Sequence, residues 1–206
     1  MSHSLPAHEP FPRTAEAADA AGPLAGLVRL CPPPATRPPA VDRAGTEAAL
    51  GTALPADYRR LVETYGCGVF DETVRLLVPG ADRPDHDLLA QTAEREEILR
   101  SLWDFADEEP PAELAEPGSR LVPWAFEEGS GAFLYRLVRP GRHPDTWTVL
   151  YNEGRGPLWE AHGTGCAAFL HGVLAGTVET AYFGYLYEVR KPVERRFEPV
   201  AEALGG

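Results

Sequence analysis

The clearest pattern of hydrophobic positions along the chain lies just before residue 66. Four apolar side chains recur there at i, i+3, i+4 and i+7, namely Tyr58, Leu61, Val62 and Tyr65. This spacing places them on one side of a helix. Pro55 suits the first turn of that helix, because its missing N–H would have no partner there, and Gly66 suits its end. The pattern predicts a helix with one stripe facing a core.

Weaker patterns predict the remaining elements. A short helix can run from Thr46 to Gly51, and a later one from Thr164 to Gly176. The longest helical candidate covers residues 87–105, with its apolar side supplied by Leu88, Leu89, Leu99, Leu102 and Phe105. Strand patterns bounded by Pro and Gly turns cover residues 73–78, 121–126, 132–138, 146–151 and 158–161. This order predicts an α+β fold, with an antiparallel-rich sheet of about 4–6 strands and helices packed on one face.

The organisation that follows is one central domain with two extensions. Residues 1–40 are rich in Pro and Ala and predict a loosely held arm, in which residues 24–30 could form one short helix. The α+β domain covers residues 41–176. Residues 177–206 form an aromatic C-terminal extension. The length of 206 residues and the 44% of hydrophobic residues are enough for a single core.

Charge is unevenly placed along the chain. Residues 82–116 hold 12 acidic and 3 basic side chains, a net charge of −9, while the whole chain carries −12. Such a surface repels phosphate backbones, so we expect no nucleic-acid partner. It would attract a basic protein surface and speed the encounter with it. An ordinary solvated helix and loop is the alternative interpretation of the same charges.

Other sequence features exclude several classes. No apolar run reaches the length of a membrane span, and the first 17 residues lack the order of a secretion signal. Three cysteines, at 31, 67 and 166, are too few for a disulfide framework. We therefore expect a cytoplasmic protein with no membrane partner.

Candidate chemistry is sparse. His162 and Cys166 lie four apart at a predicted helix start, where the helix dipole could lower the pKa of a thiol. No third orienting group accompanies them, and a buried structural cysteine is the preferred interpretation. No Cys-x-x-Cys or His-x-x-x-His pair is present. We therefore expect no catalytic residue, no metal site and no cofactor.

Three motifs stand within residues 41–176. They are Leu54-Pro55-Ala56-Asp57-Tyr58 closed by Tyr65-Gly66, Leu121-Val122-Pro123-Trp124-Ala125-Phe126 followed by Gly129 and Gly131, and Phe169-Leu170. Together they resemble the SUKH superfamily, which contains yeast cell-wall-synthesis regulators and bacterial immunity proteins that neutralise toxins. The motifs are structural, so they indicate the fold better than the partner. The Pro-rich start and the aromatic tail depart from the family pattern.

The resemblance implies a protein-binding function. The first hypothesis is an immunity-type protein that neutralises a cognate toxin with a basic domain by masking the surface of that toxin. The alternative is a regulatory or scaffold module that binds a cellular protein with no toxin involved. The acidic segment supplies the candidate partner-binding residues, which are Trp103, Asp104, Asp107, Glu108 and Glu109. The ring would anchor the contact and the carboxylates would steer it, although Trp103 could instead pack inward.

Overall fold

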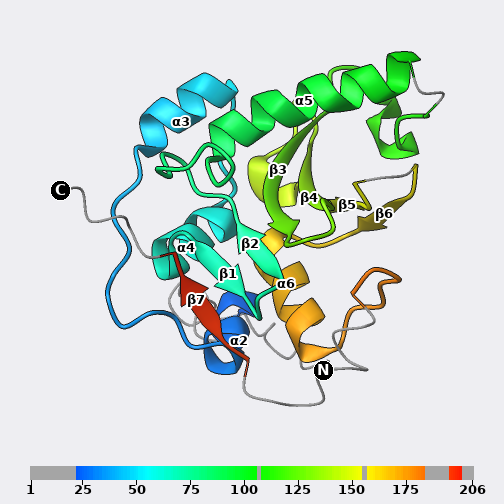
Figure 1. The fold of residues 1–206 in the computed structure, drawn as a ribbon. Helices are drawn as coiled ribbons and strands as arrows, with labels where there is room; N and C mark the ends of the chain where they lie inside the picture. The colour runs from blue at the N-terminus through cyan, green and yellow to red at the C-terminus, as the bar shows by residue number, and fades with distance from the viewer. Residues whose placement is uncertain (1–21, 106–107, 155–156, 184–194, 201–206) are drawn as a thin grey trace, which may run out of the picture.

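The computed structural model describes residues 22–105, 108–154, 157–183 and 195–200 (Figure 1). Its helices are α2 (Pro23–Leu30), α3 (Arg43–Leu50), α4 (Ala56–Tyr65), α5 (Leu88–Phe105) and α6 (Cys166–Ala175), with the 3₁₀ helices η1 (Ala112–Ala115) and η2 (Pro144–Thr146). Its strands are β1 (Gly68–Phe70), β2 (Val74–Leu76), β3 (Arg120–Glu127), β4 (Phe133–Val138), β5 (Val149–Asn152), β6 (Trp159–His162) and β7 (Phe197–Pro199).

These strands form one antiparallel sheet in the order β6-β5-β4-β3-β2-β1-β7. At its centre β3 pairs with β4, with Phe126 opposite Phe133. The predicted α+β class and antiparallel sheet are confirmed. The described sheet has seven strands rather than 4–6, because β1 and β7 have three residues each and are too short to give an alternating pattern.

Helices cover both faces of the sheet, whereas the sequence predicted one face. Phe133 on β4 faces α5, since the guanidinium of Arg95 lies 4.5 Å from the centre of its ring. Arg136, also on β4, faces α4, because its guanidinium lies 4.1 Å from the ring of Tyr58. All six residues of β4 are buried, as expected for a strand enclosed on both sides. Figure 1 shows α5 and α6 separated by the central strands.

The predicted stripe of α4 is confirmed. Its four members, Tyr58, Leu61, Val62 and Tyr65, are all buried. The hydroxyl of Tyr58 donates to the carbonyl of Leu77 at 2.6 Å, and that of Tyr65 donates to the carbonyl of Cys31 at 2.7 Å. Each ring therefore fills the core while its polar atom has a partner.

The core extends beyond residues 41–176 on both sides. α2 packs against α6, and Leu27 and Cys31 have no exposed surface. At the other end β7 pairs with β1, and the ring centres of Phe197 and Phe70 lie 4.7 Å apart. Parts of both predicted extensions thus share one core with the central domain, while residues 1–21, 184–194 and 201–206 lie outside the described ones.

The motif around Asp57 is a structural joint between α4 and α6. The Asp57 carboxylate accepts a hydrogen bond from the N–H of Ala167, in the first turn of α6, at 3.3 Å. The start of α4 is held in the same way, since Asp145 accepts from the N–H of Ala56 at 2.6 Å. These carboxylates satisfy helix-end donors from a distance. They replace the local cap at Thr164 that the sequence predicted.

Arg136 is a buried charge whose side chain has no hydrogen-bonding partner among the described residues. It is 1% exposed, and none of its three side-chain nitrogens has a hydrogen bond to the described part of the chain. The Tyr58 ring supplies a cation–π contact. That contact offsets only part of the unfavourable free energy of removing a guanidinium from water.

Replacing Arg136 by Met is therefore expected to raise the free energy of unfolding by about 1–4 kcal/mol. Methionine keeps much of the packing volume and removes the desolvated charge. Urea unfolding gives the value, and the exposed Arg142→Met is the matched control, expected within about 0.5 kcal/mol of the parent. A clear loss of stability in Arg136→Met would contradict the assignment of Arg136 as a destabilising charge.

Candidate functional site

The acidic segment, residues 82–116, runs from the loop before α5 to the end of η1. Several of its carboxylates have partners at 2.6–2.9 Å: Asp85 with Arg83, Asp87 with the N–H of Ala90, Glu94 with Gln91, Glu96 with Arg100, and Glu116 with Arg139. All of these except Glu116 lie before α5 or in its first half. The first part of the segment thus uses its acids to hold the local structure.

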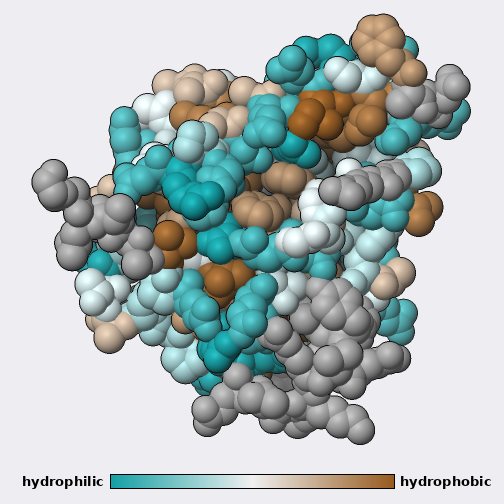
Figure 2. Space-filling view, in the orientation of Figure 1, coloured by the Kyte–Doolittle hydropathy of each residue, from teal (hydrophilic) through white to brown (hydrophobic). Residues whose placement is uncertain are grey.

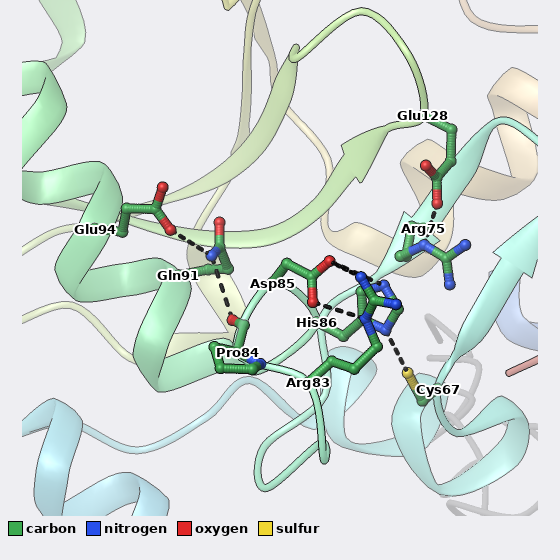
Figure 3. Close-up of polar contacts among 9 residues, drawn as sticks. All are labelled: Cys67, Arg75, Arg83, Pro84, Asp85, His86, Gln91, Glu94 and Glu128. Atoms are coloured by element: carbon green, nitrogen blue, oxygen red, sulfur yellow. Dashed lines mark hydrogen bonds and ion pairs between the residues drawn. The ribbon is translucent and has the colours of Figure 1, made fainter. Parts of the chain in front are cut away.

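Figure 3 shows the polar cluster where the loop before α5 meets β2. The hydrogen bond from Arg83 lowers the pKa of Asp85 to about 2. His86 lies between two groups, with Nε2 3.8 Å from Oδ2 of Asp85 and Nδ1 3.8 Å from Sγ of Cys67. Burial lowers the pKa of His86 and raises the pKa of Cys67. At neutral pH the imidazole is uncharged and the thiol protonated, so the pair is not an activated nucleophile.

Acidification is expected to destabilise the protein through His86. Its pKa in the folded state is below the ordinary 6.5, so the unfolded chain takes up the proton first. The stability that comes from keeping His86 uncharged is fully present above about pH 6.5. It is lost as the pH falls from there through the lowered pKa of the folded state. Urea unfolding across roughly pH 5–8 measures it. His86→Gln should remove this part of the pH dependence, whereas His143→Gln, at a 75% exposed side chain, should leave it.

The other described carboxylates of the segment have no hydrogen bond or ion pair with described residues. They are Asp82, Glu97, Asp104, Glu108, Glu109 and Glu113, while Asp107 lies outside the described residues. All except Asp82 follow the middle of α5. Asp104 lies in the last turn, which has no basic residue. A carboxylate at the negative end of the helix dipole is unfavourable. Asp104 therefore does not stabilise α5.

Phe105, the last residue of α5, is 87% exposed. The sequence assigned it to the apolar side of the helix, and this is wrong. Phe105 follows the buried Leu99 by six residues, so at about 100° per residue it points away from the core. Trp103, the predicted anchor, is partly buried against the core. In Figure 2 the surface at the upper right, over the end of α5, has hydrophobic residues next to hydrophilic ones.

We call this surface the acidic end of α5, comprising Glu97, Asp104, Phe105, Glu108 and Glu109. The helix beneath it is held by contacts to β3 and by the buried Leu88 and Leu99. This surface therefore contains three of the predicted residues, Asp104, Glu108 and Glu109, together with an exposed ring that the sequence analysis missed. No group of three or more metal-ligating side chains occurs among the described residues.

His162 and Cys166 do not form a catalytic pair. Cys166 has no exposed surface, and burial raises its pKa well above the ordinary value. Nε2 of His162 lies 3.2 Å from Oε2 of Glu160, and its ring centre lies 4.7 Å from that of Phe169. Cys166 is therefore the buried structural cysteine that the sequence favoured.

Comparisons of the chain with protein families, curated proteins and solved structures found no match. The resemblance to the SUKH superfamily thus stays a prediction. In the described residues no helix is both long and apolar enough to cross a membrane.

Proposed function

We propose that this chain is a non-enzymatic protein-binding domain whose acidic end of α5 docks onto a basic surface of another protein. One observation carries the proposal: Phe105 is 87% exposed beside carboxylates that have no partner among the described residues. An exposed ring with a charged rim has the composition of an interface hot spot and its surroundings. Residues that violate local rules of stability are often retained for function.

The position of this surface on α5 supports the same proposal. α5 packs on the central strand β3, so its end is presented by a preformed helix, and binding requires little ordering of the backbone. The carboxylates add long-range attraction to a basic partner, which raises the association rate more than the final affinity.

Within this class we favour an immunity-type protein that masks a cognate toxin. The support is the resemblance to the SUKH superfamily, together with the charge. Toxins that act on nucleic acids need basic clefts, and an acidic cover competes for the same surface. The alternative is a regulatory or scaffold module with a cellular partner. A toxin gene beside the gene for this chain would favour the first.

A cytoplasmic location is part of the proposal. All three cysteines, Cys31, Cys67 and Cys166, are free thiols. Free thiols persist in a reducing compartment, whereas secreted proteins tend to pair them.

Reversing two charges at the acidic end of α5 is expected to slow association. The partner is first captured from lysate of the source cell with the wild-type chain as bait. For the double variant Asp104→Lys, Glu109→Lys we expect association about tenfold slower at low salt, with the difference shrinking as ionic strength rises. Stopped-flow or surface-binding kinetics at several salt concentrations measure it.

The matched control is Glu63→Lys with Glu179→Lys, two exposed carboxylates outside the acidic segment. This control changes the net charge by the same amount. We expect it to slow association less, and the difference between the two double variants measures how much the location of the charges matters. Equal slowing by both double variants would show that only net charge matters. Unchanged kinetics in the Asp104, Glu109 variant would contradict the proposed docking surface.

A further inference from the structure

A cavity of about 310 Å³ lies between the Pro-rich segment 37–41 and α4. In Figure 1 this segment and α4 lie far from the C-terminal end of α5. The floor of the cavity is apolar and buried, and is formed by Leu54, Tyr58, Val62 and Pro79. The cavity is therefore separate from the acidic end of α5 and differs from it in chemistry.

Residues 38–41 of the Pro-rich segment add apolar lining, and the charged side chains of the lining are mostly cationic. Arg37, Arg43 and Arg59 line the cavity from three segments, and Glu63 is the single acidic group among them. Their net charge of +2 contrasts with −12 for the whole chain. The guanidinium of Arg59 has no hydrogen bond or ion pair with the described part of the chain, although its Nε atom is itself buried. Arg43 has a loose, exposed ion pair with Glu47 at 4.0 Å, so these guanidinium groups keep donors for a ligand.

The wall opposite α4 is fixed in place. Pro38 packs so closely on Gly66 that a Cβ atom there would lie 2.7 Å from the Pro38 Cβ, and Gly66 has φ +68°. The hydroxyl of Tyr65 anchors the chain shortly before this segment, by donating to the carbonyl of Cys31 at 2.7 Å. Pro38 and Pro39 also restrict the backbone. The cavity is thus preformed, as ligand sites usually are.

We propose that this cavity binds a small organic carboxylate, with the compact apolar body on the floor and the carboxylate on Arg59 and Arg43. The volume lies at the lower end of the roughly 300–1,000 Å³ of ligand pockets. Guanidinium groups match carboxylates in geometry and charge. Glu63 disfavours a second negative charge, so a monocarboxylate fits better than a phosphate dianion. This site is independent of the proposed docking surface.

An NMR titration of the ¹⁵N-labelled full chain tests the proposal, with 3-phenylpropionate as the probe. We expect saturable shifts centred on residues 54–63, with a Kd on the order of 1 mM. The neutral 3-phenylpropanamide and inorganic phosphate should each bind with a Kd that is higher by about tenfold or more. The amide lacks the charge and phosphate lacks the apolar body, so the two compounds test the two parts of the site separately.

Variants complete the test. Arg59→Gln should weaken 3-phenylpropionate binding about tenfold, while Arg142→Gln, an exposed position outside the cavity, should not change it. Equal binding of the amide or of phosphate, shifts centred elsewhere, or no saturable shift up to about 20 mM would overturn the proposal. If Arg59→Gln does not fold, the affinities of the three compounds for the wild-type chain still test whether the cavity binds a carboxylate with an apolar body.

Discussion

Replacing Leu61 by Ala is expected to lower the free energy of unfolding by about 2–5 kcal/mol. Leu61 has no exposed surface and lies in the buried stripe of α4. The substitution removes apolar contacts and leaves a cavity that the surrounding core fills only in part. Urea unfolding at equilibrium gives the difference, provided that the slope with denaturant is the same for both proteins.

Glu63→Ala is the control on the same helix. Glu63 is exposed, so its truncation should change stability by no more than about 0.5 kcal/mol. A similarly small effect of Leu61→Ala would contradict the packing of α4 and, with it, the arrangement of the core around this helix.

Hydrophobic spacing and capping residues predicted those helices and strands whose ends are set by neighbouring residues in the sequence. α4 is an example, because its stripe has helical spacing and Gly66 ends it with a positive φ. The start of α3 was placed at Thr46, whereas the helix begins at Arg43, since the Asp42 carboxylate accepts from the N–H of Gly45 at 3.0 Å. Asp42 is an equally good capping residue, so this signal was present in the sequence.

Other features depend on residues far away in the chain and could not be predicted. Asp57 caps α6 across 110 positions, and no local pattern records such a contact. The enclosure of β4 by helices on both faces was also not predictable, because an arginine in the middle of a strand, here Arg136, is typical of a solvent-facing side. Its guanidinium instead lies beneath the Tyr58 ring.

The candidate site was predicted in part. Charge counts located the acidic segment, because net charge is read directly from the residues. The division between partnered and unpartnered carboxylates was not predictable, since Glu116 pairs with Arg139 from a distant part of the chain. The exposure of Phe105 could have been found, because its helical angle relative to the other apolar residues of α5 already places it off the buried side.

Phe105→Ser is expected to reduce the affinity for the captured partner by about 2 kcal/mol or more, close to thirtyfold. A ring that is exposed in the free protein and buried in the complex contributes its full apolar transfer free energy, and the contacts around such a ring exclude water from it. Because Phe105 is 87% exposed, the substitution should leave the free energy of unfolding unchanged within about 0.5 kcal/mol.

The most direct test of the docking surface compares Phe105→Ser with Leu158→Ser by calorimetric titration of the captured partner. Among the described residues Leu158 is the other exposed large hydrophobic side chain, at 58%, and it lies just before β6. The account predicts a loss of about thirtyfold for Phe105→Ser and less than about threefold for Leu158→Ser. Wild-type affinity in Phe105→Ser, or an equal loss in Leu158→Ser, would contradict the acidic end of α5 as the binding surface.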